Sequence, residues 1–194
     1  MGLKLLSIAS LLLASCVVMI LHEIPKTVLF FYFEKKPRLG KNLRKSYQFI
    51  DPIGLIFSLT GFCGFSKSYM LRTKRDKNNL YLGLAGFIML LLLTAGGFLI
   101  CRFAFIEVDM SHYFSVFWFM FFQYISITAF GMFFVNLFPL MTFDMGLVIA
   151  AKSREKYFSI IRNDYLIKMI FILCALLGII RSLCINSFLF FYQM

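Results

Sequence analysis

Long apolar segments, separated by short polar connections, dominate this chain. They are residues 5–33, 49–65, 80–106, 113–151 and 165–192. A membrane-spanning helix needs about 20 apolar residues, so the first, third and fifth segments are long enough to cross a bilayer. The fourth is too long for one uniform span, and Pro139 predicts a break near its end. The pattern therefore predicts a multi-pass membrane protein.

The second apolar segment is shorter than the others and richer in helix-breaking residues. Residues 49–65 hold Pro52, Gly54, Gly61 and Gly64, which favours a re-entrant or interfacial hairpin over a crossing. We therefore expect an all-α integral membrane fold with a single membrane domain over residues 1–194. Its four spans are expected at about 5–33, 80–106, 113–140 and 165–192, with the re-entrant segment at about 49–65.

Composition supports this fold class and excludes several others. Of the 194 residues, 61% are hydrophobic and 15% are charged, and the mean hydropathy is +0.85, far from the composition of an ordinary soluble domain. A disordered chain and a collagen-like repeat are excluded, and a nucleic-acid binder is disfavoured. The five cysteines are scattered and form no CxxC pair, so neither a disulfide framework nor a zinc knuckle is indicated.

Charged residues in the connections predict the orientation of the spans. The connections 35–45, 67–77 and 152–162 are rich in Lys and Arg, whereas the connection 107–112 carries Glu107 and Asp109 and no Lys or Arg. By the positive-inside rule, the three basic connections are cytoplasmic and both termini are external. The net charge of +11 is then explained by topology and by anionic lipid headgroups, without a nucleic-acid partner.

A competing signal lies near the N-terminus. Leu13-Ala14-Ser15-Cys16 matches the lipobox at which bacterial lipoprotein signals are cleaved. The apolar run continues past Cys16 to Phe33 without a polar mature segment. This favours an uncleaved span and leaves lipidation of Cys16 open.

Two polar clusters interrupt the apolar segments, and ionisable groups inside a span are costly enough to mark candidate functional sites. The first segment contains His22-Glu23-Ile24-Pro25-Lys26, and the fourth contains residues 136–146, from Asn136 through Pro139 to Asp144. His22 follows Leu5 by about 17 residues, roughly 25 Å of helix, which places it toward the predicted cytoplasmic end. The second cluster lies near the same end of its segment, so we expect both at a similar depth.

These motifs make the chain resemble the site-2 protease family of intramembrane zinc metalloproteases, which carries HExxH on an early span and NxxPxxxxDG on a later one. The two polar clusters match these motifs at His22, Glu23, Asn136, Pro139, Asp144 and Gly146. Asp51-Pro52-Ile53-Gly54 and the stretch 61–67 are similar to the family's DPxG…GFGxxK segment, and Ala85-Gly86 stands where compact bacterial members have AGPxxN.

The resemblance implies a site-2-protease-like core and a role for each matching residue. His22 and Asp144 would hold zinc, Glu23 would activate the zinc-bound water, and Asn136 with Pro139 would position a substrate. It also implies a compact bacterial form, located in the cytoplasmic membrane, that handles the transmembrane segment of another protein.

The departures from the family pattern bear on the metal. Lys26 replaces the second histidine of HExxH, and smaller departures occur at Ser68, Phe87, Leu90 and Met145. Catalytic zinc needs three protein ligands, of which His22 and Asp144 would supply two. The usual contribution of a lysine is a positive charge where a cation would bind. His112, the other histidine of the chain, is placed externally by the charge pattern and is discounted as a ligand.

We therefore hypothesise that Lys26, Glu23 and Asp144 form an ion cluster in place of zinc, because two buried carboxylates need a compensating cation. The predicted function is that of a pseudoprotease with an impaired or metal-free site, which binds a partner transmembrane segment and is surrounded by membrane lipids. The alternative is an active intramembrane zinc metalloprotease that cleaves membrane helices. The cofactor is zinc in that case and none otherwise. A small ion transporter has less support, since no inverted repeat is visible.

The same residues also have purely structural explanations. His22 and Glu23 are compatible with a satisfied polar pair inside a helix bundle. Asn136 is compatible with a cap on backbone groups freed by a broken helix. Asp51-Pro52 is a common start of a helix, and the glycines of segment 80–106 favour close helix packing. The sequence leaves these alternatives open.

Overall fold

The computed structural model describes residues 2–34, 46–67, 73, 75–105 and 112–193, and within these residues it contains helices and no strand. Three of the described helices are long and apolar enough to cross a membrane: α1 (Gly2–Phe33), α3 (Asp76–Ala104) and α4 (Tyr113–Asn136). The bent pair α7 (Asp164–Leu176) and α8 (Ile179–Gln193) would make a fourth span. The predicted all-α fold is therefore confirmed for the described residues, and three to four of their helices, against the four spans predicted, are long and apolar enough to cross a membrane.

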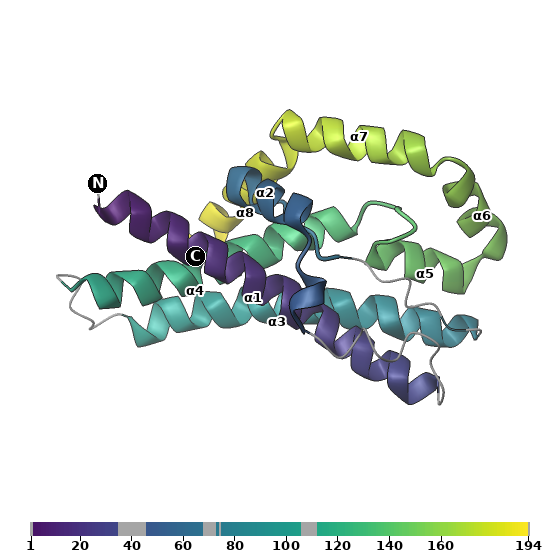
Figure 1. Ribbon diagram of the computed structural model, residues 1–194, viewed down its shortest axis with the longest axis horizontal. Coiled ribbons are helices and arrows are strands. Elements are labelled where there is room, and N and C mark those ends of the chain that lie inside the picture. Colours follow the sequence, from purple (N-terminus) through teal and green to yellow (C-terminus); the bar gives the residue numbers. More distant parts are fainter. Residues whose placement is uncertain (1, 35–45, 68–72, 74, 106–111, 194) are drawn as a thin grey trace.

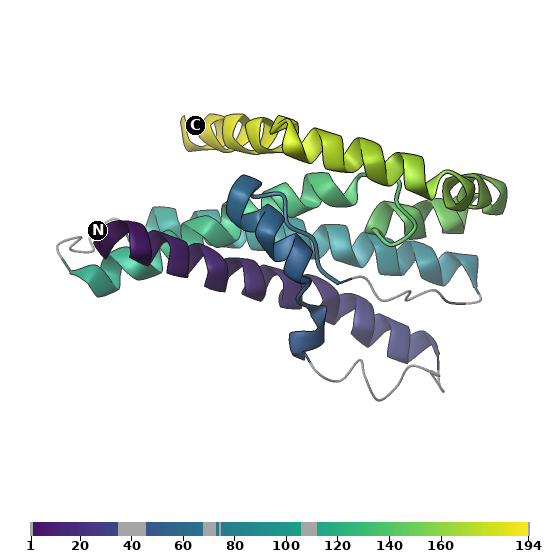
Figure 2. The same cartoon turned by 45° about the horizontal axis from the view of Figure 1, so that its top comes forward.

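The three long helices form the centre of the molecule. In Figures 1 and 2 they lie side by side along its long axis, with α3 running opposite to α1 and α4. Their shared core is made of apolar side chains that range from alanine to phenylalanine: Ala14, Val18 and Met19 of α1, Leu90 of α3, and Phe121, Ile125, Ala129 and Met132 of α4. In a bilayer such close van der Waals packing is the main force that holds helices together.

Helix α2 (Pro52–Gly61) begins at a strong helix-start signal. The side chain of Asp51 accepts hydrogen bonds from the backbone N–H groups of Ile53 (2.9 Å) and Gly54 (3.0 Å). Pro52 occupies the first helical position, where its missing N–H group costs nothing. The helix-start role that the sequence allowed for Asp51-Pro52 is the one observed here.

The chain then reverses and returns along α2. Phe62 ends the helix with a left-handed φ of 57°. A Cβ atom on Gly54 would lie 2.0 Å from the carbonyl oxygen of Phe65, so glycine is needed for the return segment to lie this close. The N–H of Lys67 donates to the carbonyl of Phe49 at 2.8 Å and closes the hairpin. This hairpin lies beside the middle of the bundle (Figures 1 and 2).

The fourth apolar segment is divided near Pro139. Helix α4 ends at Asn136, and a connection over residues 137–143 contains Pro139. Two short helices follow, α5 (Asp144–Lys152) and α6 (Arg154–Arg162). The division turns the candidate residue Asp144 into the first residue of a new helix.

The last apolar segment differs from the single span expected over 165–192. Helices α7 and α8 are bent by 57° relative to each other. The break lies at Gly178, whose φ of 69° is a left-handed conformation that glycine adopts without a Cβ clash. The residues on both sides of Gly178 are mainly apolar, so the hydrophobic pattern of the sequence did not indicate a bend at this position.

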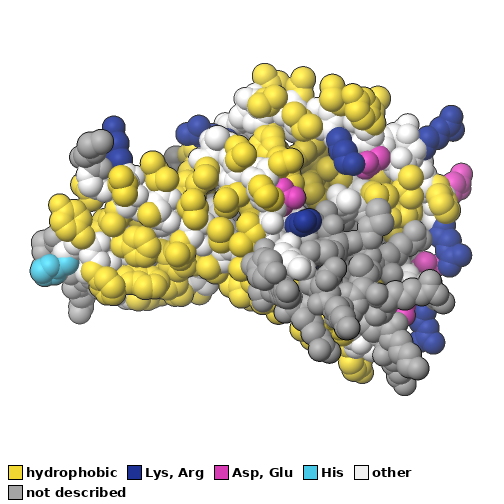
Figure 3. All heavy atoms as spheres, viewed as in Figure 1, with side chains coloured by type: hydrophobic (Ala, Val, Ile, Leu, Met, Phe, Trp, Pro, Cys, Tyr) yellow, Lys and Arg dark blue, Asp and Glu magenta, His cyan; other side chains and the backbone are white. Residues whose placement is uncertain are grey.

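The two ends of the bundle differ in charge. The N-terminus of α1, the last turn of α3 and the first turn of α4 lie at one end, and α6 runs across the other end to join α5 to α7 (Figures 1 and 2). Hydrophobic side chains cover most of the described surface in Figure 3, and charged side chains lie mainly toward the end formed by α5 and α6. The basic connection 35–45, most of 67–77, and Glu107 and Asp109 lie outside the described residues.

Gly97 and Gly96 offer a matched test of this packing. A Cβ atom on Gly97 would lie 2.8 Å from the carbonyl oxygen of Phe122, whereas one on Gly96 would meet no atom within 4 Å. We expect Gly97→Ala to lower the free energy of unfolding by about 1–3 kcal/mol, because α3 and α4 must move apart. Gly96→Ala should leave it unchanged or raise it by up to about 1 kcal/mol, because alanine is the better helix former and meets no neighbour there. Loss of helical circular dichroism on heating in detergent measures both, and equal midpoints would contradict the packing.

Candidate functional site

Helix α1 brings three candidate residues to one buried position. His22 and Lys26 are one helical turn apart and share a face, and Glu23 lies beside them. Their exposed fractions are 0%, 5% and 2%, respectively. The Thr27 hydroxyl donates to the carbonyl oxygen of Glu23 at 2.8 Å, close to Pro25 within the same helix. An apolar helix thus carries its polar residues inward, away from lipid.

Asp144 reaches the same position from the start of α5. Its backbone N–H donates to Oδ1 of Asn136 at 3.4 Å, and Nδ2 of Asn136 donates to the carbonyl oxygen of Met132 at 2.9 Å. Asn136 therefore links the end of α4 to the start of α5, in the capping role that the sequence left open. Pro139 lies in the connection between these two helices.

Two glycines of α3 make room for Asp144. A Cβ atom on Gly86 would lie 2.2 Å from Oδ2 of Asp144, and one on Gly83 would lie 2.8 Å from its carbonyl oxygen. Any side chain at position 86 would collide with the carboxylate. The glycines therefore have the packing role that we expected, and Gly86 in particular leaves the space in which the Asp144 side chain lies.

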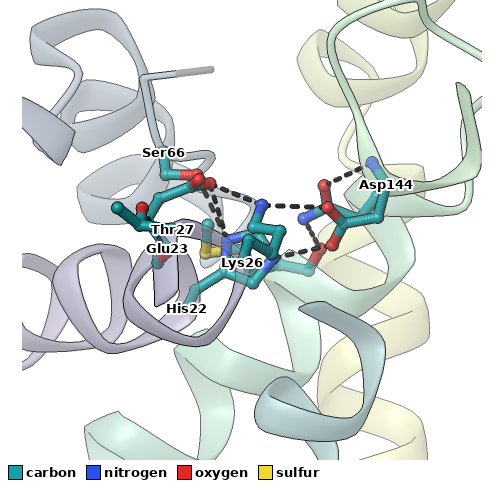
Figure 4. Close-up of polar contacts among 8 residues, drawn as sticks. His22, Glu23, Lys26, Thr27, Ser66 and Asp144 are labelled. Atoms are coloured by element: carbon teal, nitrogen blue, oxygen red, sulfur yellow. Dashed lines mark hydrogen bonds and ion pairs between the residues drawn. The ribbon is translucent and has the colours of Figure 1, made fainter. Parts of the chain in front are cut away.

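The four candidate side chains meet in one cluster, drawn in Figure 4. Lys26 Nζ donates to Oε1 of Glu23 at 2.6 Å and to Oδ1 of Asp144 at 2.9 Å. His22 Nε2 lies 2.7 Å from Oδ2 of Asp144. An ammonium group thus bridges two buried carboxylates that belong to different helices, and the histidine holds the second oxygen of one of them. We call these four residues the ion cluster.

Ser66, on the return segment of the α2 hairpin, completes the cluster. Its hydroxyl donates to Oε1 of Glu23 and lies 3.2 Å from Nδ1 of His22. Sequence reasoning did not single out this serine, because a lone hydroxyl in an apolar stretch carries no spacing signal. Its segment was noticed through the similarity of residues 61–67 to the family pattern. The contact ties the hairpin to α1 at the depth of the cluster.

The arrangement does not fit a zinc ion. Among the described residues, no group of three or more His, Cys, Asp or Glu side chains is placed to hold a metal. The Asp144 oxygens are occupied by His22 and Lys26, and a protonated lysine has no lone pair for a metal. His112 immediately precedes α4, whose 24 residues separate it from Asn136 by roughly 36 Å of helix. The structure brings His22, Glu23, Lys26 and Asp144 together and leaves His112 apart.

A groove lies beside the ion cluster. It is formed by the α2 hairpin, the 137–143 connection and α7, and its walls include Phe57, Phe65, Phe143, Phe171 and Ser66. Phe171 of α7 packs between these rings, with centroid distances of 6.0 Å to Phe65 and 5.7 Å to Phe143. Ser66 belongs both to the wall of the groove and to the cluster. The groove is therefore mainly apolar, with Asp51, Thr142 and Lys168 also in its lining, and Ser66 connects its wall to the ion cluster.

Comparison with known proteins gave no match for this chain. No protein-family model matches it, and no curated protein or solved structure does so either.

Removing the bridging ammonium tests the electrostatics of the cluster. We expect Lys26→Met to lower the free energy of unfolding by about 3–5 kcal/mol, because it leaves Glu23 and Asp144 buried without their cation. A variant that adds Glu23→Gln and Asp144→Asn to Lys26→Met removes the charges together and should recover most of this loss. Unfolding in detergent, followed by circular dichroism, compares the two. A single variant as stable as the native protein would contradict the compensating role of Lys26.

Proposed function

We propose that this chain is a metal-free, site-2-protease-like membrane protein that binds the transmembrane segment of a partner without cleaving it. One observation carries the proposal: Lys26 Nζ lies 2.6 Å from Glu23 and 2.9 Å from Asp144, at the position where the family motif has its second histidine. The contact between His22 and Asp144 across α1 and α5 supports the kinship that the motifs suggest.

An ammonium group can replace a zinc ion as a structural element but not as a catalyst. Both supply positive charge to Glu23 and Asp144, so either can hold α1 and α5 together in a medium of low dielectric constant. Zinc accepts lone pairs and presents a bound water, whereas the Lys26 ammonium only donates hydrogen bonds. A cluster closed by Lys26 therefore keeps the scaffold and loses the hydrolytic water.

The surroundings of Glu23 also favour a non-catalytic role. Its Oε1 atom receives hydrogen bonds from Lys26 and Ser66. A general base must be within hydrogen-bond reach of the proton that it removes, and this oxygen is already engaged. In a metal-free site, peptide-bond hydrolysis would lack the metal-bound water that serves as its nucleophile.

The groove beside the cluster supplies a surface for a partner segment. Its aromatic walls, with Phe57, Phe65 and Phe143, suit apolar side chains of a membrane helix, and Thr142 adds a hydroxyl group for backbone contacts. We infer that the partner segment enters from the lipid and lies against the α2 hairpin and α7.

Metal analysis gives a direct test. We expect the purified native protein to contain far less than one zinc per chain, because Lys26 occupies the cation position. Lys26→His should raise zinc toward one per chain, since it restores the HExxH spacing. The matched control is Lys26→His combined with Asp144→Asn, which should lose the gained zinc. Elemental analysis by mass spectrometry measures all three, and stoichiometric zinc in the native protein would overturn the metal-free proposal.

A second experiment separates binding from cleavage. The native protein and Glu23→Gln are reconstituted in vesicles with a single-span substrate protein that has a helix-breaking segment. We expect no cleavage by either, and photo-crosslinking of the substrate from a benzophenone amino acid at Ile53 in the groove. The control is the same probe at Ile88 of α3, which is similarly exposed (55% against 61%) but does not line the groove.

Each outcome of this experiment discriminates. Cleavage that depends on Glu23 would establish the alternative, an active intramembrane protease. Equal crosslinking from Ile53 and Ile88, or none from either, would remove the binding function.

A further inference from the structure

A second polar site lies at the elbow between α5 and α6, away from the ion cluster. Ser153 joins the two helices with an extended backbone (φ −153°, ψ 115°). The inner side of the elbow encloses a pocket lined by Ile149, Lys152, Ser153, Lys156, Ser159 and Ile160. Ile149 and Lys152 of α5 are three residues apart, and Lys156, Ser159 and Ile160 of α6 are three and four residues apart, so each helix turns one mixed face toward the hollow.

The two lysines of this pocket have no carboxylate partner among the described residues. Neighbouring cations at the same end of the molecule do have one, since Arg154 pairs with Asp76 at 2.9 Å and Lys168 pairs with Asp164. Glu155 lies next to Lys156 in the sequence but does not line the pocket. Two uncompensated positive charges in one hollow favour an anionic ligand.

The other walls of the pocket indicate what kind of anion fits. Ile149 and Ile160 give it an apolar side, and the hydroxyl of Ser159 adds a hydrogen-bond donor. A small inorganic anion uses the lysines and the hydroxyl but leaves the isoleucines without a partner. A phospholipid uses both, because its phosphate is attached to a glycerol with apolar chains.

The position of α6 suits a site at the membrane surface. This helix runs across the end of the bundle between α5 and the apolar helix α7 (Figures 1 and 2). It combines basic residues with exposed Phe158 (63%) and Ile161 (39%), as helices that lie in the interface between lipid and water do. The basic connection 152–162 is also the one that charge patterning assigns to the cytoplasmic, anionic leaflet.

We propose that the α5–α6 pocket binds the phosphate of an anionic phospholipid headgroup. Lys152 and Lys156 contact the phosphate oxygens, Ser159 donates a hydrogen bond, and the two isoleucines lie against the glycerol and the first methylene groups. The site does not depend on the proposed function of the ion cluster, from which it is separated by the length of α5.

Native mass spectrometry of the detergent-solubilised protein tests this site with phosphatidylglycerol as the probe and phosphatidylcholine as the neutral-headgroup comparison. We expect tighter binding of phosphatidylglycerol, and a loss of about tenfold or more in its affinity in the double variant Lys152→Gln/Lys156→Gln. The matched control is Lys77→Gln/Arg162→Gln. It removes the same charge from exposed residues outside the pocket, and it should weaken binding less than about twofold.

Three results would overturn the proposal. Equal losses in the two double variants would assign the effect to diffuse charge. An unchanged affinity in the pocket variant would place the lipid elsewhere. Inorganic phosphate that binds as tightly as phosphatidylglycerol and displaces it would make free phosphate the ligand. We expect millimolar phosphate to leave the bound phosphatidylglycerol in place.

Discussion

The contacts of Lys26 with Glu23 and Asp144 join two helices through charges buried in the interior of the protein. Burying a charged side chain in a membrane span costs free energy, because the charge loses its contact with water. Direct contact with an opposite charge offsets much of this cost. Glu23 and Lys26 belong to α1, but Asp144 belongs to α5, so satisfying them fixes one helix against the other. Position 86 of α3 must then be glycine, because the carboxylate of Asp144 lies where a side chain at this position would be. Local charge compensation thereby sets the arrangement of three helices.

A metal and an ammonium group place different demands on the same two carboxylates. Zinc draws its ligands into a tetrahedron and leaves one position open for water. The ammonium of Lys26 instead donates hydrogen bonds to carboxylate oxygens of Glu23 and Asp144. Lys26 belongs to the same helix as His22 and lies one turn after it. The cluster is closed within the protein, with the hydroxyl of Ser66 as an additional donor to Glu23. A site of this kind stabilises the contact between α1 and α5 through charges and hydrogen bonds of the protein alone.

The sequence predicted those features that follow from composition and spacing. Apolar length predicted the long helices, Pro139 predicted the break after α4, and the two polar clusters at matching depth predicted that His22 and Asp144 would meet. Other features depend on tertiary contacts that leave no periodic signal. The bend at Gly178 interrupts a run that is apolar on both sides. Ser66 acquires its partners because the α2 hairpin returns toward α1, and only the folded chain shows where that return ends. The assignment to a protease family is a proposal that rests on motifs.

Helix α5 connects the buried cluster to the elbow with α6. It has 9 residues, and helices shorter than about 12 residues are marginal on their own, so contacts at its ends must hold it. At its start, Asp144 is fixed by Lys26 and His22 through its side chain and by Asn136 through its backbone. Just beyond its end, Arg154 pairs with Asp76 at the start of α3, and Lys152 and Lys156 face the proposed lipid site. An anion bound there would restrain the far end of the same helix that presents Asp144. The ion cluster and the proposed lipid site therefore lie at the two ends of one short helix, which depends on contacts at both ends.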